Sequence, residues 1–484
     1  MVMKRKPNII LIVMDTVRAD HLSCYGYFRK TTPNLDKIAG KGVLFENAFS
    51  AAPWTPPSHA SIFSGSYPSE HKTIGRNISL RKDVELLSQV LSEKHFRTIG
   101  LTCCNLLSRR SGFSRGFQEY ADIGETRKTV SLVSKDLFSS ILNGPDKGAY
   151  VTNELAKKML RRHFSRNTQQ PFFMFINYFE CHTPYDPPRP FKKMFCNEKF
   201  RQKGNVREIV IRKILGRTTE TVDDPDLDIR KLQKISSGEG GFSFSTKKLS
   251  ISTKEWDMVK SWYDGELNYL DFRIGELISF LQNEGVFEDT LFVLTSDHGE
   301  NFGEHGLAVH PLCLYDSVLR VPLIFGGGPM SSGEKKLSQI VSTVDIFPTI
   351  LDIVGLKTPT NIAGRTLSPF EDRIVHQFVC AEYGGLHLLS LKAPQFSKEL
   401  DLIDQGCKCI RNQNYKYIYY ANKEELYDLK EDPGEKVNIA LKHPEKAIKL
   451  KRELQKTIDI SYFGPKDFSP DTNMMDRLKA LGYA

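Results

Sequence analysis

The first three quarters of the chain alternate between short apolar runs and stretches with helical periodicity. The apolar runs predict β-strands at Asn8–Met14, Thr98–Thr102, Phe172–Tyr178, Thr290–Thr295 and Val321–Phe325. The helical patterns predict helices at Leu35–Ala39, Leu86–His95, Val151–His163, Glu255–Gln282 and Ile346–Val354. Strands that alternate with helices favour an α/β fold, with a mostly parallel sheet sandwiched by helices.

The pattern changes near Pro369. Short β-type runs at Val375–Ala381 and Tyr415–Tyr420 precede a charged helical pattern at Glu445–Ile458. We therefore expect two domains. Residues 1–370 form the α/β domain, and residues 371–484 form a smaller α+β domain with a small antiparallel sheet and a helix.

Composition excludes several classes of protein. Of the 484 residues, 40% are hydrophobic and 26% charged, which is typical of a folded domain and not of a disordered chain. No apolar run reaches the roughly 18 residues of a membrane span, and the run Ile9–Met14 is too short for a signal peptide. Because the nine cysteines are odd in number and form no C-x-x-C pair, we expect reduced thiols and a cytoplasmic protein.

The net charge of +9 comes mostly from one segment. Lys192–Arg217 holds nine Lys or Arg and two acidic residues, within a basic and polar insertion at residues 192–252. Two readings stay open, a solvated surface loop and an electropositive rim that attracts an anionic substrate. Since Phe195 and Phe200 are the only aromatic residues of Lys192–Arg217, we expect no nucleic-acid partner.

Candidate metal ligands follow two of the predicted strands. Asp15 comes directly after Asn8–Met14, and Asp297 and His298 come just after Thr290–Thr295. In parallel sheets the functional site lies beyond the carboxyl ends of the strands, so these residues can meet there. Two carboxylates and an imidazole suit a divalent metal ion.

A candidate nucleophile lies between them in the sequence. Pro53–Gly65 predicts a proline-rich loop that enters a helix, and the N–H groups at a helix N-terminus favour bound anions. A hydroxyl just before this helix can attack a phosphorus or sulfur centre if a metal ion lowers its pKa.

Motifs along most of the chain resemble the sulfatase family of the alkaline phosphatase superfamily. The nucleophile motif of that family is Cys/Ser-x-Pro-Ser-Arg-Ala-x-x-x-x-Gly. This sequence has Thr55 at the nucleophile position and His59 in place of the arginine, and it matches at Pro57, Ser58, Ala60 and Gly65. Further family-like segments, in order, are Asn8–Gly26, Thr32–Asp36, His182–Tyr185, Ser296–Glu300, Gly303–Gly306, Arg320–Leu323, Val344–Thr349, Glu425–Leu429, Asp432–Glu435 and Leu481–Tyr483.

The resemblance implies an alkaline-phosphatase-like fold and a metal-dependent hydrolase of sulfate or phosphate esters, whose substrate is a small anionic ester. It implies one divalent ion (Ca, Mg, Mn or Zn) held by Asp15, Thr55, Asp297 and His298. Oxidation of threonine gives a ketone, so no formylglycine is expected at Thr55. An unmodified threonine is similar to the nucleophile of phosphonate monoester and phosphodiester hydrolases.

The resemblance also implies supporting residues. His182 and His310 are expected to contact the anion or the leaving group, and Asn105 to bind the substrate. His59 is expected either to shape the nucleophile loop or to transfer a proton. An alternative function is a non-catalytic, anion-binding protein of the same fold. A homo-oligomer is compatible with the sequence.

Overall fold

The computed structural model describes residues 6–75, 77–124, 146–166, 169–196, 250–310, 313–330, 333–385, 406–420 and 423–463. The strands of its main sheet are β1 (Asn8–Met14), β2 (Val43–Phe49), β3 (Arg97–Thr102), β4 (Glu119–Asp122), β5 (Phe172–Tyr178), β6 (Thr290–Thr295), β7 (Arg320–Val321), β8 (Leu323–Gly327) and β9 (Lys335–Ser342). Their order is β4-β3-β5-β1-β6-β8-β2-β7, and β9 also pairs with β2.

The main sheet is mixed but mostly parallel. β4, β3, β5, β1 and β6 run parallel to one another, whereas β8 runs antiparallel to β6 and β2. β1 lies in the middle, and all seven of its residues are buried. This confirms the predicted fold class, since a strand covered on both faces is apolar along its whole length.

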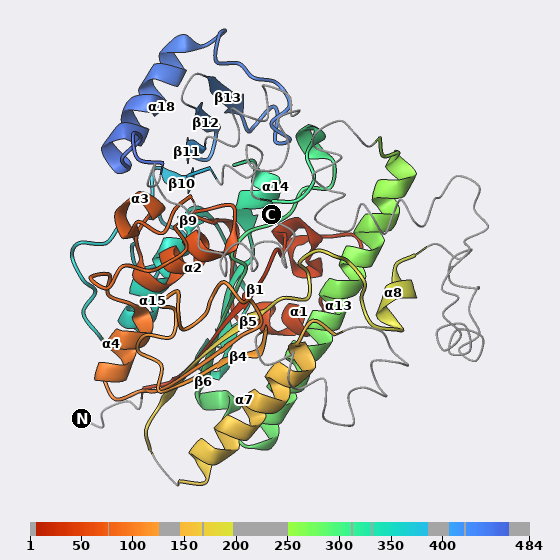
Figure 1. The fold of residues 1–484 in the computed structure, drawn as a ribbon, viewed down its shortest axis with the longest axis vertical. Helices are drawn as coiled ribbons and strands as arrows, with labels where there is room; N and C mark the ends of the chain where they lie inside the picture. Colours follow the sequence, from red (N-terminus) through yellow and green to blue (C-terminus); the bar gives the residue numbers. More distant parts are fainter. Residues whose placement is uncertain are drawn as a thin grey trace.

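Helices cover both faces of the main sheet (Figure 1). One face carries α1 (Pro33–Ala39), α7 (Ala149–Phe164) and α13 (Thr253–Asn283), and the other carries α2 (Thr55–Ser64), α4 (Leu87–Glu93) and α15 (Ile346–Ile353). Alternate residues of β1 enter the two apolar cores, with Ile10 and Ile12 facing α13 and Ile9 and Leu11 facing α2.

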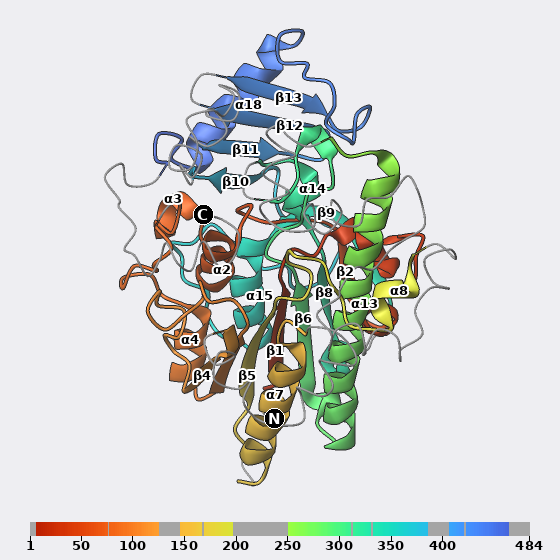
Figure 2. The same cartoon turned by 45° about the vertical axis from the view of Figure 1, so that its right-hand side comes forward.

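A second, antiparallel sheet follows in the C-terminal part. It contains β10 (Val379–Tyr383), β11 (Cys407–Arg411), β12 (Tyr415–Tyr420) and β13 (Glu424–Asp428), and α18 (Pro444–Thr457) packs on it. Figure 2 shows this sheet beyond the end of the main sheet, near α14 (Asp316–Leu319) and α3 (Pro68–His71). The placement of a domain boundary at residue 370 stays a prediction.

Two expectations about elements need correction. The predicted strand Val321–Phe325 is two strands, because Pro322 has no N–H for a ladder hydrogen bond and separates β7 from β8. The predicted strand Val375–Ala381 begins later, at Val379. Of Lys192–Arg217, only the part up to Cys196 is described, and it includes the short helix α8 (Phe191–Met194); the rest of the segment lies outside the described residues.

All nine cysteines lie in the described part, and none forms a disulfide. Within the same described ranges, no helix has the length and apolar character needed to cross a bilayer.

Candidate active site

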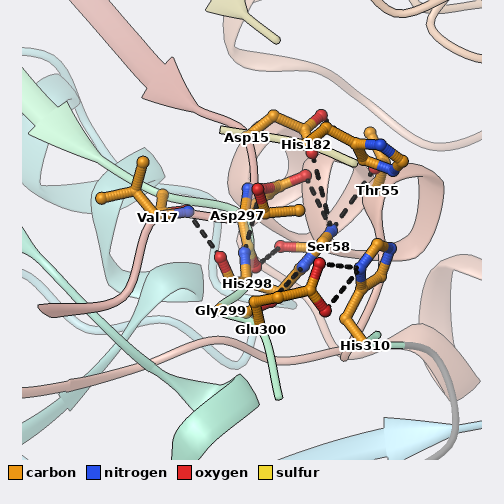
Figure 3. Close-up of polar contacts among 12 residues, drawn as sticks. Asp15, Val17, Thr55, Ser58, His182, Asp297, His298, Gly299, Glu300 and His310 are labelled. Carbon is orange, nitrogen blue, oxygen red and sulfur yellow. Dashed lines mark hydrogen bonds and ion pairs between the residues drawn. The ribbon is translucent and has the colours of Figure 1, made fainter. Parts of the chain in front are cut away.

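Three segments meet at the carboxyl end of the central strands. Val13 of β1 pairs in register with Thr295 of β6, so Asp15 emerges beside Asp297 and His298. The side chains of these three residues are fully buried, and one ligand atom from each lies within 4.8 Å of the other two (Figure 3).

Thr55 joins this group from the first residue of α2. Its Oγ1 lies 3.5 Å from Asp15 Oδ2 and 3.4 Å from His298 Nε2. Trp54 precedes it in an extended conformation, and the side chain of Thr55 is 1% exposed. The four residues that the resemblance implies as metal ligands are thus brought together by strand ends and one helix start.

The hydrogen bonds of His298 set which ring nitrogen faces the cluster. Nδ1 lies 2.9 Å from the carbonyl oxygen of Gly299, which can only accept, so Nδ1 carries the proton. Nε2 then presents a lone pair toward Asp15 Oδ1 at 3.9 Å and Asp297 Oδ2 at 3.4 Å. This is the tautomer in which a neutral imidazole binds a metal ion.

Two carboxylate oxygens at the centre are buried without a hydrogen bond, Asp15 Oδ1 and Asp297 Oδ2. Burial and the nearby Asp297 raise the pKa of Asp15 well above its usual value, and burial also raises the pKa of Asp297. Burial lowers the pKa of His298, which keeps the ring neutral. Two adjacent buried carboxylates without a counter-charge are costly, so this set of donors fits a divalent cation.

The backbone after β1 is shaped to hold Asp297. Thr16 has a φ of +59°, which is uncommon for a β-branched residue. This turn directs the N–H of Thr16 toward Asp297 Oδ1 at 3.3 Å, and the N–H of His298 donates to the same oxygen at 2.9 Å. One oxygen of Asp297 is therefore fixed by the backbone while the other faces the cluster.

His182 and His310 lie beside the cluster. The ring of His310 stacks on that of His298 with centroids 4.2 Å apart, and His182 meets His310 edge to face at 5.1 Å. Burial lowers the pKa of both residues, that of His310 to about 3. Both rings thus form a group of adjacent imidazoles with His298, and their roles toward an anion or a leaving group stay predictions.

Glu300 supports His310, a contact that the sequence did not indicate. Its carboxylate oxygens both lie 3.3 Å from His310 Nδ1, and Oε2 accepts a hydrogen bond from Tyr185 Oη at 2.9 Å. Burial raises the pKa of Glu300 to about 7. Glu300 belongs to the Ser296–Glu300 motif, but the motif does not show which side chain Glu300 contacts.

His59 and Asn105 have different surroundings. His59 Nδ1 lies 2.9 Å from the carbonyl oxygen of Thr55 and 3.5 Å from Asp297 Oδ2, so its contacts favour a part in shaping the nucleophile loop. Asn105 follows β3 and packs against Gly124, where an added Cβ would lie 1.8 Å from Asn105 Oδ1. Substrate binding by Asn105 stays a prediction.

The start of α2 offers few N–H groups for an anion. We expected the N–H groups at the start of α2 to hold the anionic oxygens, but Pro56 and Pro57 have no N–H. The N–H of Ser58 already donates to the Trp54 carbonyl at 3.3 Å. Among these positions the N–H of Thr55 is left, and its contact with an anion stays a prediction.

Comparisons with known proteins place the chain in a family. The family model for sulfatases matches residues 7–356, and a second model, for the C-terminal region of N-sulphoglucosamine sulphohydrolase, matches residues 303–460. The chain belongs to the sulfatase family. As a member of the alkaline phosphatase superfamily, it is a hydrolase of a metal-dependent class.

Relatives of this sulfatase-family chain are distant but nearly full-length. An N-acetylglucosamine-6-O-sulfatase of Bacteroides thetaiotaomicron is 25% identical over 510 residues, covering 96% of this chain and 88% of that protein. The multifunctional alkaline phosphatase superfamily protein PehA of Trinickia caryophylli is 24% identical, covering 90% and 92%. The crystal structure of a phosphonate monoester hydrolase of Agrobacterium radiobacter shares the fold, with a TM-score of 0.69, 20% identity, and coverage of 93% and 95%.

Proposed function

We propose that this protein hydrolyses sulfate, phosphate or phosphonate esters with Thr55 as the nucleophile and a divalent metal ion as cofactor. The observation that carries the proposal is the position of Thr55 Oγ1, between Asp15 and His298 and beside carboxylate oxygens that lack hydrogen bonds. A hydroxyl in this setting is placed for attack on an anionic ester.

The ligands of the cation would be Asp15, Thr55, Asp297 and His298. When bound, a divalent cation supplies the positive charge that lowers the pKa of an adjacent hydroxyl and offsets the charge of an ester oxygen. Asp15 and Asp297 together carry two negative charges when ionised, so their charge is balanced by one such ion.

Each residue of the site has a proposed role in the first displacement. Thr55 Oγ1 forms a bond to the sulfur or phosphorus atom while the bond from that atom to the departing alkoxide breaks. The proton of the Thr55 hydroxyl points to Asp15 Oδ2, which lies 3.5 Å from Thr55 Oγ1 and can accept it. His182 and His310 are the candidates for contact with the leaving oxygen, and each would stabilise negative charge there as an imidazolium, because its Nδ1 already faces Thr183 or Glu300.

Release of the acid requires a second attack. Threonine has a single hydroxyl on Cβ, so its ester cannot expel sulfate by the elimination available to an aldehyde hydrate. Water must therefore attack the sulfur or phosphorus atom of the Thr55 ester. The unmodified threonine is similar to the nucleophile of phosphonate monoester and phosphodiester hydrolases and favours these substrates within the proposed range. Sulfate esters belong in the same test because of the sulfatase relatives.

The test is a panel of aryl sulfate, phosphate monoester, phosphodiester and phosphonate monoester substrates, each with Mn, Mg, Ca or Zn. Thr55→Ala should lower kcat by roughly three or more orders of magnitude, whereas Thr55→Ser should keep part of the activity. Intact mass during turnover of a slow substrate should show an adduct that maps to Thr55.

Two outcomes would contradict the proposal. Near-normal turnover by Thr55→Ala on every active substrate would indicate a water nucleophile. Binding of the anions without turnover under any metal would favour the non-catalytic alternative.

A further inference from the structure

The loop that carries His182 rests on a buried ion pair. This loop follows β5 and runs over residues 179–186. Lys147 lies two residues before α7, and Glu266 lies in the middle of α13. Lys147 Nζ contacts Glu266 Oε1 at 2.7 Å, and their side chains are 12% and 1% exposed.

The pair contacts the loop on both sides of the histidine. Lys147 Nζ donates to the carbonyl oxygen of Glu180 and to that of His182 at 2.7 Å. Glu266 Oε1 accepts the N–H of Asp186 at 2.9 Å. Since an ammonium group has three protons, Lys147 uses all of them on Glu266 and the loop.

The place of the His182 ring depends on this backbone. The ring stacks on Phe179 with centroids 4.3 Å apart, and its Nδ1 lies 2.9 Å from the carbonyl oxygen of Thr183. Both partners belong to the same loop, so they move with it. Lys147 therefore contacts the backbone that carries the imidazole, whose centroid lies 5.1 Å from that of His310.

We propose that the Lys147–Glu266 pair is a positioning unit for ester hydrolysis, which holds the His182 imidazole over the Thr55 site. The proposal rests on the proposed function, in which His182 contacts the anion or the leaving group. A misplacement of about 1 Å is enough to lower a rate roughly a hundredfold.

The alternative is that the Lys147–Glu266 pair only stabilises the fold. An experiment can distinguish this role from positioning of His182. Removal of one partner leaves a buried charge and destabilises the fold, whereas replacement of both by apolar residues of similar size is often neutral. The informative variant is therefore the double substitution Lys147→Met with Glu266→Met.

We expect the double variant to unfold somewhat below the wild-type midpoint, because the carbonyl oxygens of Glu180 and His182 lose their donor, and to keep the rise in Tm caused by Mn²⁺. Its kcat should fall roughly ten- to a hundredfold, with little change in KM. In a His182→Ala background the same double substitution should cause no further loss. A wild-type kcat in the double variant, or a full additional loss in the His182→Ala background, would overturn the proposal.

Lys147→Arg is the second variant, in case the double variant does not fold. It keeps the charge, but a planar guanidinium cannot reproduce the three contacts of an ammonium group. It should lower kcat with a small change in Tm, and an unchanged kcat would contradict the positioning role.

A readout without turnover separates this proposal from the proposed function. The ring NMR signals of His182, assigned by their absence in His182→Ala, should shift in the double variant or in Lys147→Arg, while those of the half-exposed His443 stay. Unshifted His182 signals overturn the positioning role. A wild type that hydrolyses no ester in the panel counts against the proposed function alone.

Discussion

Asp15 and Asp297 each direct one carboxylate oxygen to a position without a hydrogen-bond donor. Natural proteins rarely leave buried polar atoms in this state, so each case calls for an explanation. Here the oxygens face the lone pair of His298 Nε2, and the proposed divalent cation would satisfy all three groups. This explanation has a consequence for stability that can be measured without a substrate.

Asp15→Asn should remove the stabilisation by metal. The substitution abolishes one of two adjacent buried charges, so the Tm in EDTA should stay the same or rise. The additional rise in Tm on adding Mn²⁺, which follows from binding to the native state, should disappear. Differential scanning fluorimetry measures both values.

Asp83→Asn is the matched control, because the side chain of Asp83 is 62% exposed. It should keep the full rise in Tm with Mn²⁺. The metal assignment would be wrong if Asp15→Asn kept the same rise.

Glu300→Gln should weaken catalysis through His310. An amide has one acceptor oxygen, so its NH₂ group would face one of the two donors, Tyr185 Oη or His310 Nδ1. We expect kcat to fall roughly ten- to a hundredfold, with the larger loss on esters with poor leaving groups. A comparison of nitrophenyl and alkyl esters tests this expectation, and an equal loss on both would argue against contact between His310 and the leaving oxygen.

The start and the end of α2 show how a short element places Thr55. Trp54 enters in an extended conformation, Pro56 and Pro57 fix the first turn, and Gly65 ends the helix with a φ of +68°. All ten residues of the helix are buried, so the helix is positioned by packing on both sides. A change at Gly65 should therefore cost more than the backbone strain alone.

Gly65→Ala and Gly285→Ala form a matched pair. Gly285 has a φ of +71° with no atom within 4 Å of an added Cβ, so the substitution should cost about 1 kcal/mol from the left-handed backbone. At Gly65 the added Cβ would lie 3.0 Å from Ile362 Cδ1 and 3.4 Å from Phe347. Urea unfolding should show the larger loss in the free energy of unfolding for Gly65→Ala. Equal losses would mean that Ile362 and Phe347 move aside to accommodate the added methyl group.

The two sheets are joined by buried charges. Lys416 of β12 lies 2.8 Å from Asp316 at the start of α14 and 2.6 Å from Glu435, and its side chain is fully buried. Arg411 of β11 adds a contact of 2.6 Å to Asp316. These contacts attach the C-terminal sheet to the main part of the molecule, so their protonation affects the stability of the entire fold.

Glu435 should make stability fall as the pH rises. Burial raises the pKa of Glu435 from 4.5 to about 7, so the native state binds more protons than the unfolded state between these values. The free energy of unfolding then decreases from pH 5 to pH 8. Asp316, whose pKa is lowered to about 2, changes protonation only at lower pH.

Glu435→Gln should flatten this dependence in urea unfolding measured from pH 5 to pH 8. The control Glu445→Gln, at a side chain that is 69% exposed, should leave the slope unchanged. A wild-type slope in Glu435→Gln would show that another group is responsible.

The sequence determined the central strands and the identity of the clustered residues. β1, β5 and β6 agree with their predicted bounds, since a strand buried on both faces is a continuous apolar run. The candidate metal ligands Asp15, Asp297 and His298 could also be predicted from these strands, because polar residues that follow parallel strands lie at one edge of the sheet. The motifs added Thr55, His182 and His310.

Only the tertiary structure decided the rest. β2 and β9 carry polar residues within their runs, and their pairing with each other depends on segments far apart in the chain. The contacts of Glu300 with His310 and of Lys147 with Glu266 join residues up to 119 positions apart, and no local pattern encodes such a distance. Local periodicity determines whether a residue lies in a strand or a helix and whether it is buried. Which distant side chain pairs with a buried charge depends on how the elements pack.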